Sequence, residues 1–327
     1  MAIKTNIEAL RDTMAEAMRR DPSIIIVGED VGPRGGVFRA TQGLYDEFGP
    51  DRVIDSPLAE LSIIGVGIGL ALNGIRPICE IQFADFIHPA FNQIVSEAAR
   101  MRYRSNGQFH CPMVIRTPYG GGISGGLYHS QSIEAFYCHV PGIYVVAPST
   151  PYDIAGLLRA ALQSPDPVLF LEHKKTYRLI KGDVPEGDFI VPIGRADVKR
   201  AGADMTVLAY GLMLHESLRA ADVLASEGVD VEVVDLRTLA PLDKETILTS
   251  VRKTGKVLIV HEDNKTGGLG GELAAIVAEE AFEWLDGPIT RVCGPDVPAV
   301  PFSHPMQDFF MPDAARSAAA MRQLAAY

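Results

Sequence analysis

The chain is poor in several residue types whose scarcity narrows its possible roles. Only 4 of its 327 residues are cysteines, and no two of them have Cys-x-x-Cys spacing. Their scatter, mostly inside apolar runs, predicts reduced core thiols and argues against a zinc site or a disulfide framework. Such cysteine usage is typical of a cytoplasmic protein, and the residues concerned are Cys79, Cys111, Cys138 and Cys293.

Positive charge is scarce as well. The 30 lysines and arginines are outnumbered by 41 aspartates and glutamates, which gives a net charge of -11. The electrostatic field of such a negatively charged chain would not attract nucleic acid or an anionic membrane. No apolar run reaches the roughly 18 residues of a membrane span, and the N-terminus lacks the apolar core of a signal peptide. We therefore expect a cytoplasmic chain whose partner is a small molecule or another protein.

Alternation of strand and helix is what the sequence does have. Apolar residues at the 3.6-residue period predict a helix over 6–20, and a single helix is also expected over 88–104. Short apolar runs such as 24–28 are typical of strands buried on both faces. We predict an α/β fold class with two domains, 1–178 and 195–327, joined by a linker over 179–194. Each domain is expected to be a mostly parallel sheet with helices on both faces.

The turn Asp55–Glu60 is the first candidate site. It follows a predicted strand and ends in Glu60, where an apolar helix begins. Because ligands bind at the carboxyl ends of parallel strands, this position favours a functional carboxylate. The alternative is a first-turn charge that supports the helix dipole, with Ser56 or Asp55 as the cap.

Three glycines inside this helix need a separate interpretation. Gly65, Gly67 and Gly69 lack the G-x-G-x-x-G spacing and do not lie between a strand and a helix, so a dinucleotide fingerprint is disfavoured. We expect them to let the helix pack closely against another backbone.

The loop 117–132 is the second candidate site. Its five glycines in seven residues, 120–126, cannot form a helix interior or a packed strand. His129 lies just beyond them among residues that can hydrogen-bond, as a histidine that moves protons near neutral pH requires. The alternative is a solvated loop histidine or a helix cap.

Several stretches, in order along nearly the whole chain, carry a family resemblance. They are 27–32, 55–60, 80–86, 103–105, 128–132, 148–151, 235–241 and 267–268. On these stretches the chain resembles the β subunit of the thiamine-diphosphate-dependent decarboxylating component of 2-oxo acid dehydrogenase complexes, most closely the branched-chain and bacterial pyruvate types. The resemblance implies a pyrimidine-binding domain followed by a transketolase C-terminal-like domain.

The resemblance implies a role for each matching residue. Glu60 matches the glutamate that hydrogen-bonds N1′ of the cofactor's aminopyrimidine and so promotes loss of the thiazolium C2 proton. His129 matches the histidine that transfers protons when the acyl group passes to the lipoyl arm. Leu58, Gln82 and Phe86 match positions that line the aminopyrimidine pocket, although relatives commonly have tyrosine in place of Phe86. A potassium ion bound mostly by main-chain oxygens would map to Pro112, Val114, Ile115, Ala161, Ser164 and Asp166.

One motif of this family is absent. The diphosphate and magnesium motif, Gly-Asp-Gly followed by an asparagine, does not occur in the sequence, and no P-loop replaces it. The resemblance therefore implies that a separate α chain holds the diphosphate and magnesium, in an α2β2 assembly that acylates the lipoyl group of an acyltransferase component. A small 2-oxo acid would be the substrate.

Two other functions stay open at the level of the sequence. A non-catalytic subunit of the same fold is disfavoured because Glu60, Gln82 and His129 are all present. A nucleotide-dependent oxidoreductase is suggested only by the α/β pattern, and no fingerprint follows any predicted strand.

Overall fold

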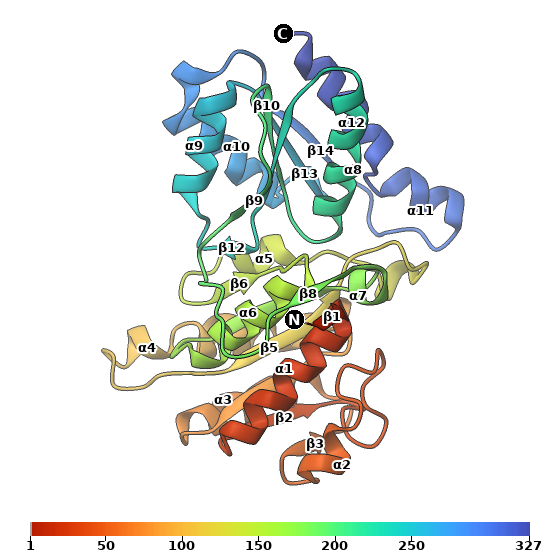
Figure 1. Ribbon diagram of the computed structural model, residues 1–327. Coiled ribbons are helices and arrows are strands. Elements are labelled where there is room, and N and C mark those ends of the chain that lie inside the picture. Colours follow the sequence, from red (N-terminus) through yellow and green to blue (C-terminus); the bar gives the residue numbers. More distant parts are fainter. Residues whose placement is uncertain (1) are drawn as a thin grey trace. The chain divides into compact units, whose positions relative to one another are not determined.

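The computed structural model describes residues 2–327 (Figure 1). Contacts divide the chain into two compact units, Met1–Tyr119 with Phe136–Ile193, and Gly120–Ala135 with Gly194–Tyr327. Both are α/β units with mostly parallel sheets, as the sequence predicts. The glycine-rich loop 120–135 belongs to the second unit although it follows a strand of the first.

The parallel sheet of the first unit has the strand order β6-β7-β5-β4-β2-β3. The chain runs from β2 to β3 on one side, and then crosses back through α3 to β4 on the other side of β2. The carboxyl ends of β2 and β4 therefore form a topological switch point, where ligands of such folds bind. The strands are β2 (Ile24–Gly28), β3 (Val53–Asp55), β4 (Arg76–Glu80), β5 (Val114–Tyr119), β6 (Tyr144–Val146) and β7 (Val168–His173).

Helices cover both faces of this sheet. On one face α1 and α6 lie side by side (Figure 1) and bury the apolar stripe of α1, including Leu10 and Met14. On the other face α3 packs against β4, where a Cβ at Gly67 would come 2.4 Å from Sγ of Cys79. The helices are α1 (Asn6–Arg20), α2 (Leu44–Phe48), α3 (Glu60–Leu72), α4 (Met101–Arg104), α6 (Pro151–Gln163) and α7 (Thr176–Leu179).

Only one of the three glycines of α3 makes the close approach expected of them. Gly67 meets side chains, those of Cys79 and Met113, and not another backbone. A Cβ at Gly65 would have one neighbour at 4.0 Å, and a Cβ at Gly69 would meet nothing within 4 Å. Within residues 2–327, therefore, none of these three glycines is in close contact with another backbone.

Two further segments differ from the sequence prediction. The helix expected over 88–104 is broken into a 3-10 turn (His88–Ala90), a π-helix (Gln93–Ala98) and α4. Within it the amide of Ala99 donates to the carbonyl of Ile94, five residues back. The expected linker contains β8 (Lys181–Val184), which pairs antiparallel with β1 (Ala2–Thr5).

A buried ion-pair network joins the central strands of this unit. Arg116 on β5 makes a bidentate pair with Glu172 on β7, at 2.7 and 2.6 Å, and a second pair with Glu80 on β4. All three side chains are almost wholly buried, and the hydroxyl of Tyr177 donates to Glu172. Burial disfavours the charged form of Arg116, but the charges of Glu172 and Glu80 outweigh that effect and raise its pKa. The network therefore depends on a permanent cation.

The sheet of the second unit has the order β14-β13-β10-β11-β9, with only β9 antiparallel. Helices α8 and α12 cover one face and α9 and α10 the other (Figure 1). Its strands are β9 (Asp197–Arg200), β10 (Met205–Ala209), β11 (Val231–Asp235), β13 (Val257–Asn264) and β14 (Thr290–Gly294). The short strand β12 (Thr238–Ala240) also belongs to this unit but is not part of this sheet. The helices are α8 (Leu212–Ser226), α9 (Lys244–Thr254), α10 (Leu269–Glu280), α11 (His304–Phe310) and α12 (Ala314–Ala325), and α5 (Glu134–Cys138) spans the return to the first unit.

Candidate active site

Polar residues gather at the switch point of the first sheet. Asp30 follows β2, and its Oδ2 accepts a hydrogen bond of 3.1 Å from the amide nitrogen of Gln82, which follows β4. Asp55 ends β3, and its Oδ1 accepts from the amide of Gly32 at 2.7 Å. The carboxyl ends of three neighbouring strands are thus tied together by carboxylates.

Glu60 lies beside this cluster as the first residue of α3. The N-cap is Ala59, which makes no side-chain capping bond, so the alternative that Ser56 or Asp55 caps this helix is wrong. Asp55 is held by Gly32 instead, and the hydroxyl of Ser56 donates to the carbonyl of Pro57. The helix therefore begins at the glutamate itself.

The surroundings of Glu60 leave its carboxylate available to bind a ligand. The residue is only 8% exposed, yet its carboxylate makes no hydrogen bond or ion pair with any residue in 2–327. Burial, followed by the charges of Asp30 and Glu60, raises the pKa of the neighbouring Glu29. A mostly buried carboxylate without a protein partner is costly unless a ligand satisfies it.

The other residues expected at this site come from two segments, the turn before α3 and the segment after β4. Leu58 is 72% exposed in the turn before α3, so its side chain offers apolar surface to a ligand. Phe86 ends a 3-10 turn (Ala84–Phe86) and packs edge-on against Phe83, with ring centroids 5.9 Å apart. The side-chain amide of Gln82 donates a hydrogen bond to Asp30. The exposed leucine and the unpartnered glutamate fit a flat ring with a polar edge.

His129 lies in the loop 120–135 of the second unit, half-buried at the end of a 3-10 turn (Gly126–Tyr128). The loop is held at both ends by one buried carboxylate, Glu262 on β13. Its Oε1 accepts from the amide of Gly121 at 2.9 Å and from the hydroxyl of Ser132 at 3.1 Å. The loop that carries the histidine is therefore fixed on the second sheet.

Side-chain amides give this loop further support. Oε1 of Gln131 accepts from the amide of Val300 at 3.2 Å, and Oε1 of Gln307 accepts from the amide of Ser124 at 2.8 Å. Gly125 approaches the histidine closely, because a Cβ there would come 2.7 Å from Cβ of His129 and 2.8 Å from its carbonyl oxygen. A glycine at this position thus sets where His129 can lie.

A buried acidic cluster below the loop was not predicted from the sequence. Oε1 of Glu134 accepts a hydrogen bond of 2.6 Å from Tyr210, and its Oε2 is buried without a hydrogen-bond partner among the described residues. Burial, followed by the charge of Asp263, raises the pKa of Glu134 to about 8. Burial also raises the pKa of Asp263 to about 6. The signal in the sequence was a pair of acids, Glu262 and Asp263, directly after an apolar strand.

The residues expected around potassium do come together in the first unit. They lie at the start of β5 and in the turn from α6 to β7, and the amide of Cys111 joins the two segments by donating to the carbonyl of Pro165 at 3.2 Å. Several of these oxygens already accept hydrogen bonds. The Asp166 carbonyl accepts from the hydroxyl of Ser164 at 2.8 Å, the Ala161 carbonyl from the amide of Ser164 at 3.1 Å, and the Ser164 carbonyl from Arg76 at 3.5 Å. The full set is Pro112, Val114, Ile115, Ala161, Ser164 and Asp166.

The cysteines and the helices bear on other classes of site. None of the four cysteines forms a disulfide, and burial raises the pKa of Cys111 to about 12. Within residues 2–327, no group of three or more His, Cys, Asp or Glu side chains is arranged to hold a metal ion. No helix in this range is long and apolar enough to cross a membrane.

Comparison with known proteins agrees with this architecture. Residues 4–180 match the transketolase pyrimidine binding domain, and residues 194–316 match the transketolase C-terminal domain. A solved structure described as a split gene transketolase, inactive beta4 tetramer, superimposes with a TM-score of 0.78 at 25% identity, covering 98% of each chain.

Relatives of known name match over nearly the whole chain. The 2-oxoisovalerate dehydrogenase subunit beta of Bacillus subtilis (strain 168) is 55% identical over 327 residues, which are 100% of both chains. The pyruvate dehydrogenase E1 component subunit beta of the same organism is 48% identical over 303 residues, 93% of each chain. The mitochondrial 2-oxoisovalerate dehydrogenase subunit beta 2 of Arabidopsis thaliana is 50% identical over 93% of this chain and 84% of its own. The chain therefore belongs to the transketolase-like family of 2-oxo acid dehydrogenase β subunits.

Proposed function

We propose that the chain is the β subunit of a thiamine-diphosphate-dependent 2-oxo acid dehydrogenase. With an α subunit it would decarboxylate a branched-chain 2-oxo acid or pyruvate oxidatively and acylate the lipoyl group of an acyltransferase component. The observation that carries the proposal is Glu60, a mostly buried carboxylate without a partner in residues 2–327, at the switch point of a pyrimidine-binding domain. The named relatives support this substrate class.

Each residue of the switch point has a task in this proposal. Bound thiamine diphosphate would supply the electron sink for decarboxylation. Glu60 would accept a hydrogen bond from the ring nitrogen N1′ of its aminopyrimidine, and Leu58 and Phe86 would border that ring. Gln82 would line the same pocket from the end of β4, with its orientation set by Asp30. Phe86 lacks the hydroxyl of the tyrosine common in relatives, so it would contribute apolar contact only.

The proposal requires a second polypeptide. The sequence has no Gly-Asp-Gly motif, so we assign the diphosphate and its magnesium ion to an α subunit in an α2β2 heterotetramer. The structural neighbour described as an inactive beta4 tetramer supports the idea that such a β chain alone is inactive. The four cysteines, none of which forms a disulfide, support assembly in the cytoplasm.

Reconstitution tests this function directly. The chain, purified with its α partner and supplied with thiamine diphosphate and magnesium, is expected to release carbon dioxide from pyruvate or from the 2-oxo acids of valine and leucine. The chain alone is expected to release none. A complete complex that assembles but decarboxylates none of these substrates would support the non-catalytic alternative and contradict the proposal.

Replacing His129 with alanine is expected to separate the two half-reactions. We assign His129 to proton transfer during acylation of the lipoyl group, so this step should lose about 10²–10⁴-fold in rate, as expected for a general acid–base residue. Carbon dioxide release, measured with an artificial electron acceptor, should change much less. The exposed His139 provides the matched alanine control. Equal losses in the two half-reactions would remove His129 from this role.

Replacing Gly125 with alanine tests the placement of His129 without changing the imidazole. The new methyl group would overlap Cβ of His129, so the loop must shift, and misplacement by about 1 Å can cost on the order of 10²-fold in rate. Lipoyl acylation should fall while decarboxylation and assembly persist. Gly69→Ala is the control, because a Cβ there meets nothing within 4 Å. An unaltered acylation rate in Gly125→Ala would show that this contact does not matter.

We also assign a potassium ion to the turn between α6 and β7. The segments concerned already meet there, and main-chain carbonyls suit this ion. Thermal unfolding measured in potassium and in sodium chloride at equal ionic strength should show higher stability in potassium.

A further inference from the structure

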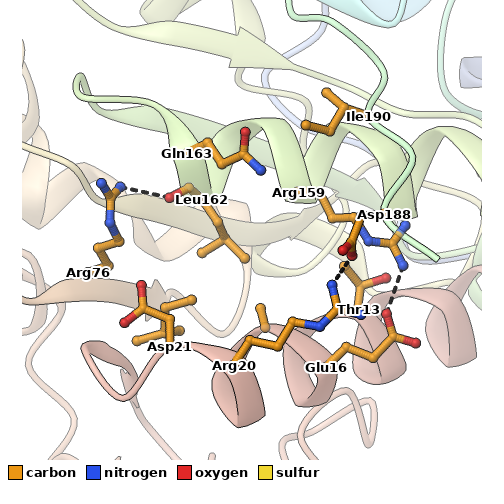
Figure 2. Close-up of a pocket in the computed structure, with 12 residues that line it drawn as sticks. Thr13, Glu16, Arg20, Asp21, Arg76, Arg159, Leu162, Gln163, Asp188 and Ile190 are labelled. Atoms are coloured by element: carbon orange, nitrogen blue, oxygen red, sulfur yellow. Dashed lines mark hydrogen bonds and ion pairs between the residues drawn. The ribbon is translucent and has the colours of Figure 1, made fainter.

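A cavity of about 460 Å³ opens in the first unit (Figure 2). It is at the amino ends of parallel strands, whereas Glu60 follows the carboxyl end of β3. It lies where β2 and β4 begin, at Ile24 and Arg76, and beside the ends of α1 and α6. Its volume is in the range of small-molecule sites. Because β2 and β4 are parallel, their amino ends are remote from the carboxyl ends that form the candidate active site.

One cation of this cavity, Arg159 on α6, is largely buried, with a side chain that is only 10% exposed. One nitrogen, Nη2, is paired with Glu16 of α1 at 2.8 Å. The other, Nη1, is buried and has no hydrogen-bond partner among the residues described. The guanidinium group also lies over the ring of Phe189, 4.8 Å from its centroid. An unsatisfied donor of a buried cation is costly, and an anionic oxygen would satisfy it.

The charges around the cavity are balanced. Arg20 forms an ion pair with Asp188, and Arg76 donates to the Leu162 carbonyl at 2.8 Å (Figure 2). Asp21 accepts from Ser23 through Oδ1 only, and within the described chain its Oδ2 accepts no hydrogen bond. Three cations therefore face three carboxylates, namely Arg20, Arg76 and Arg159 against Glu16, Asp21 and Asp188.

We propose that this cavity binds a small ammonium carboxylate of the aliphatic α-amino acid class. The carboxylate group of the ligand takes the free donor of Arg159, and its ammonium group faces Asp21. The aliphatic part lies against Leu162 and Ile190, which form the apolar wall. A zwitterion leaves the balanced charge unchanged, whereas a simple carboxylate would add an uncompensated negative charge. A 2-oxo acid lacks the ammonium group, so this ligand differs from the proposed substrate.

Calorimetric titration of the assembled α/β complex tests the proposal. L-valine is the probe, and isobutyrate and isobutylamine each carry one of its two charged groups. L-valine is expected to bind saturably, and each single-charge probe at least about tenfold more weakly, the loss that one charge-assisted hydrogen bond gives. The absence of saturable L-valine binding would overturn the proposal, and equal binding of isobutyrate would overturn the zwitterion class.

The variant Arg159→Lys locates the binding. Lysine keeps a cation for Glu16 but removes Nη1, so the affinity for L-valine should fall about tenfold. Arg19→Lys, in an exposed pair with Glu47 outside the cavity, should leave it unchanged. A second variant, Ile190→Glu, leaves the buried pair intact and places a carboxylate at the rim, where Ile190 is 42% exposed. It should also weaken binding, and unchanged affinity in both cavity variants would refute the site.

Discussion

Replacing Glu60 with glutamine is expected to slow exchange of the C2 proton of bound thiamine diphosphate by about 10²–10⁴-fold, the usual contribution of a positioned acid–base group. Glutamine has nearly the same shape but cannot carry the negative charge that holds the aminopyrimidine nitrogen. Because the carboxylate of Glu60 makes no hydrogen bond within residues 2–327, the substitution breaks no internal hydrogen bond. Assembly with the α subunit and thermal stability should therefore persist. Proton exchange followed by NMR in the assembled complex is the measurement.

Two further variants make this result specific. Glu60→Asp keeps the charge but shortens its reach, so its exchange rate should lie between those of the native chain and Glu60→Gln. Glu47→Gln removes a carboxylate from an exposed surface pair with Arg19 and should leave the rate unaltered. Normal exchange in Glu60→Gln would remove this residue from the mechanism, whatever the control shows.

Replacing Arg116 with methionine is expected to cause the largest loss of stability. The change leaves Glu80 and Glu172 buried without their cation, and breaking a buried pair in this way costs about 3–5 kcal/mol. For a unit of this size such a loss lowers the melting temperature by on the order of 10 °C. Chemical denaturation followed by circular dichroism measures the free energy of unfolding.

The dependence of this loss on pH identifies its cause. Burial raises the pKa of Glu80 in the folded state and Arg116 opposes this effect, so without the arginine the folded state binds more protons than the unfolded state. The stability deficit of Arg116→Met should therefore shrink as the pH falls. Arg102→Met breaks a partly exposed pair with Asp166 and should cost under about 1 kcal/mol, with little dependence on pH. A small loss in Arg116→Met, or one that does not vary with pH, would contradict this explanation.

The alternation of strands and helices was predictable because each element repeats a local pattern. The stripe of apolar residues in 6–20 became α1, and the continuous apolar run 24–28 became β2. The position of Glu60 after a strand was also visible, since the turn 55–60 separates two apolar segments. These features depend on neighbours in sequence, which is what periodicity reports.

Other features depend on distant partners and gave no local signal. Strands β1 and β8 are short and polar, and they pair across more than half of the chain, so their segments resembled a terminus and a linker. The π-helix over 93–98 differs from an α-helix only in its hydrogen-bond spacing, which apolar periodicity does not resolve. The hydrogen bond from Gly121 of the loop to Glu262 likewise joins residues that are 141 positions apart.

The attachment of residues 120–135 to the second sheet limits how this protein can be divided. A fragment cut near residue 193 would keep the histidine-bearing segment but lose the carboxylate, the tyrosine hydroxyl and the glutamine that anchor it. After truncation or domain exchange at that point, the loop 120–135 would remain in the N-terminal fragment without the hydrogen bonds that fix it. A functional chimera would therefore have to take residues 120–135 and residues 194–327 from the same parent protein.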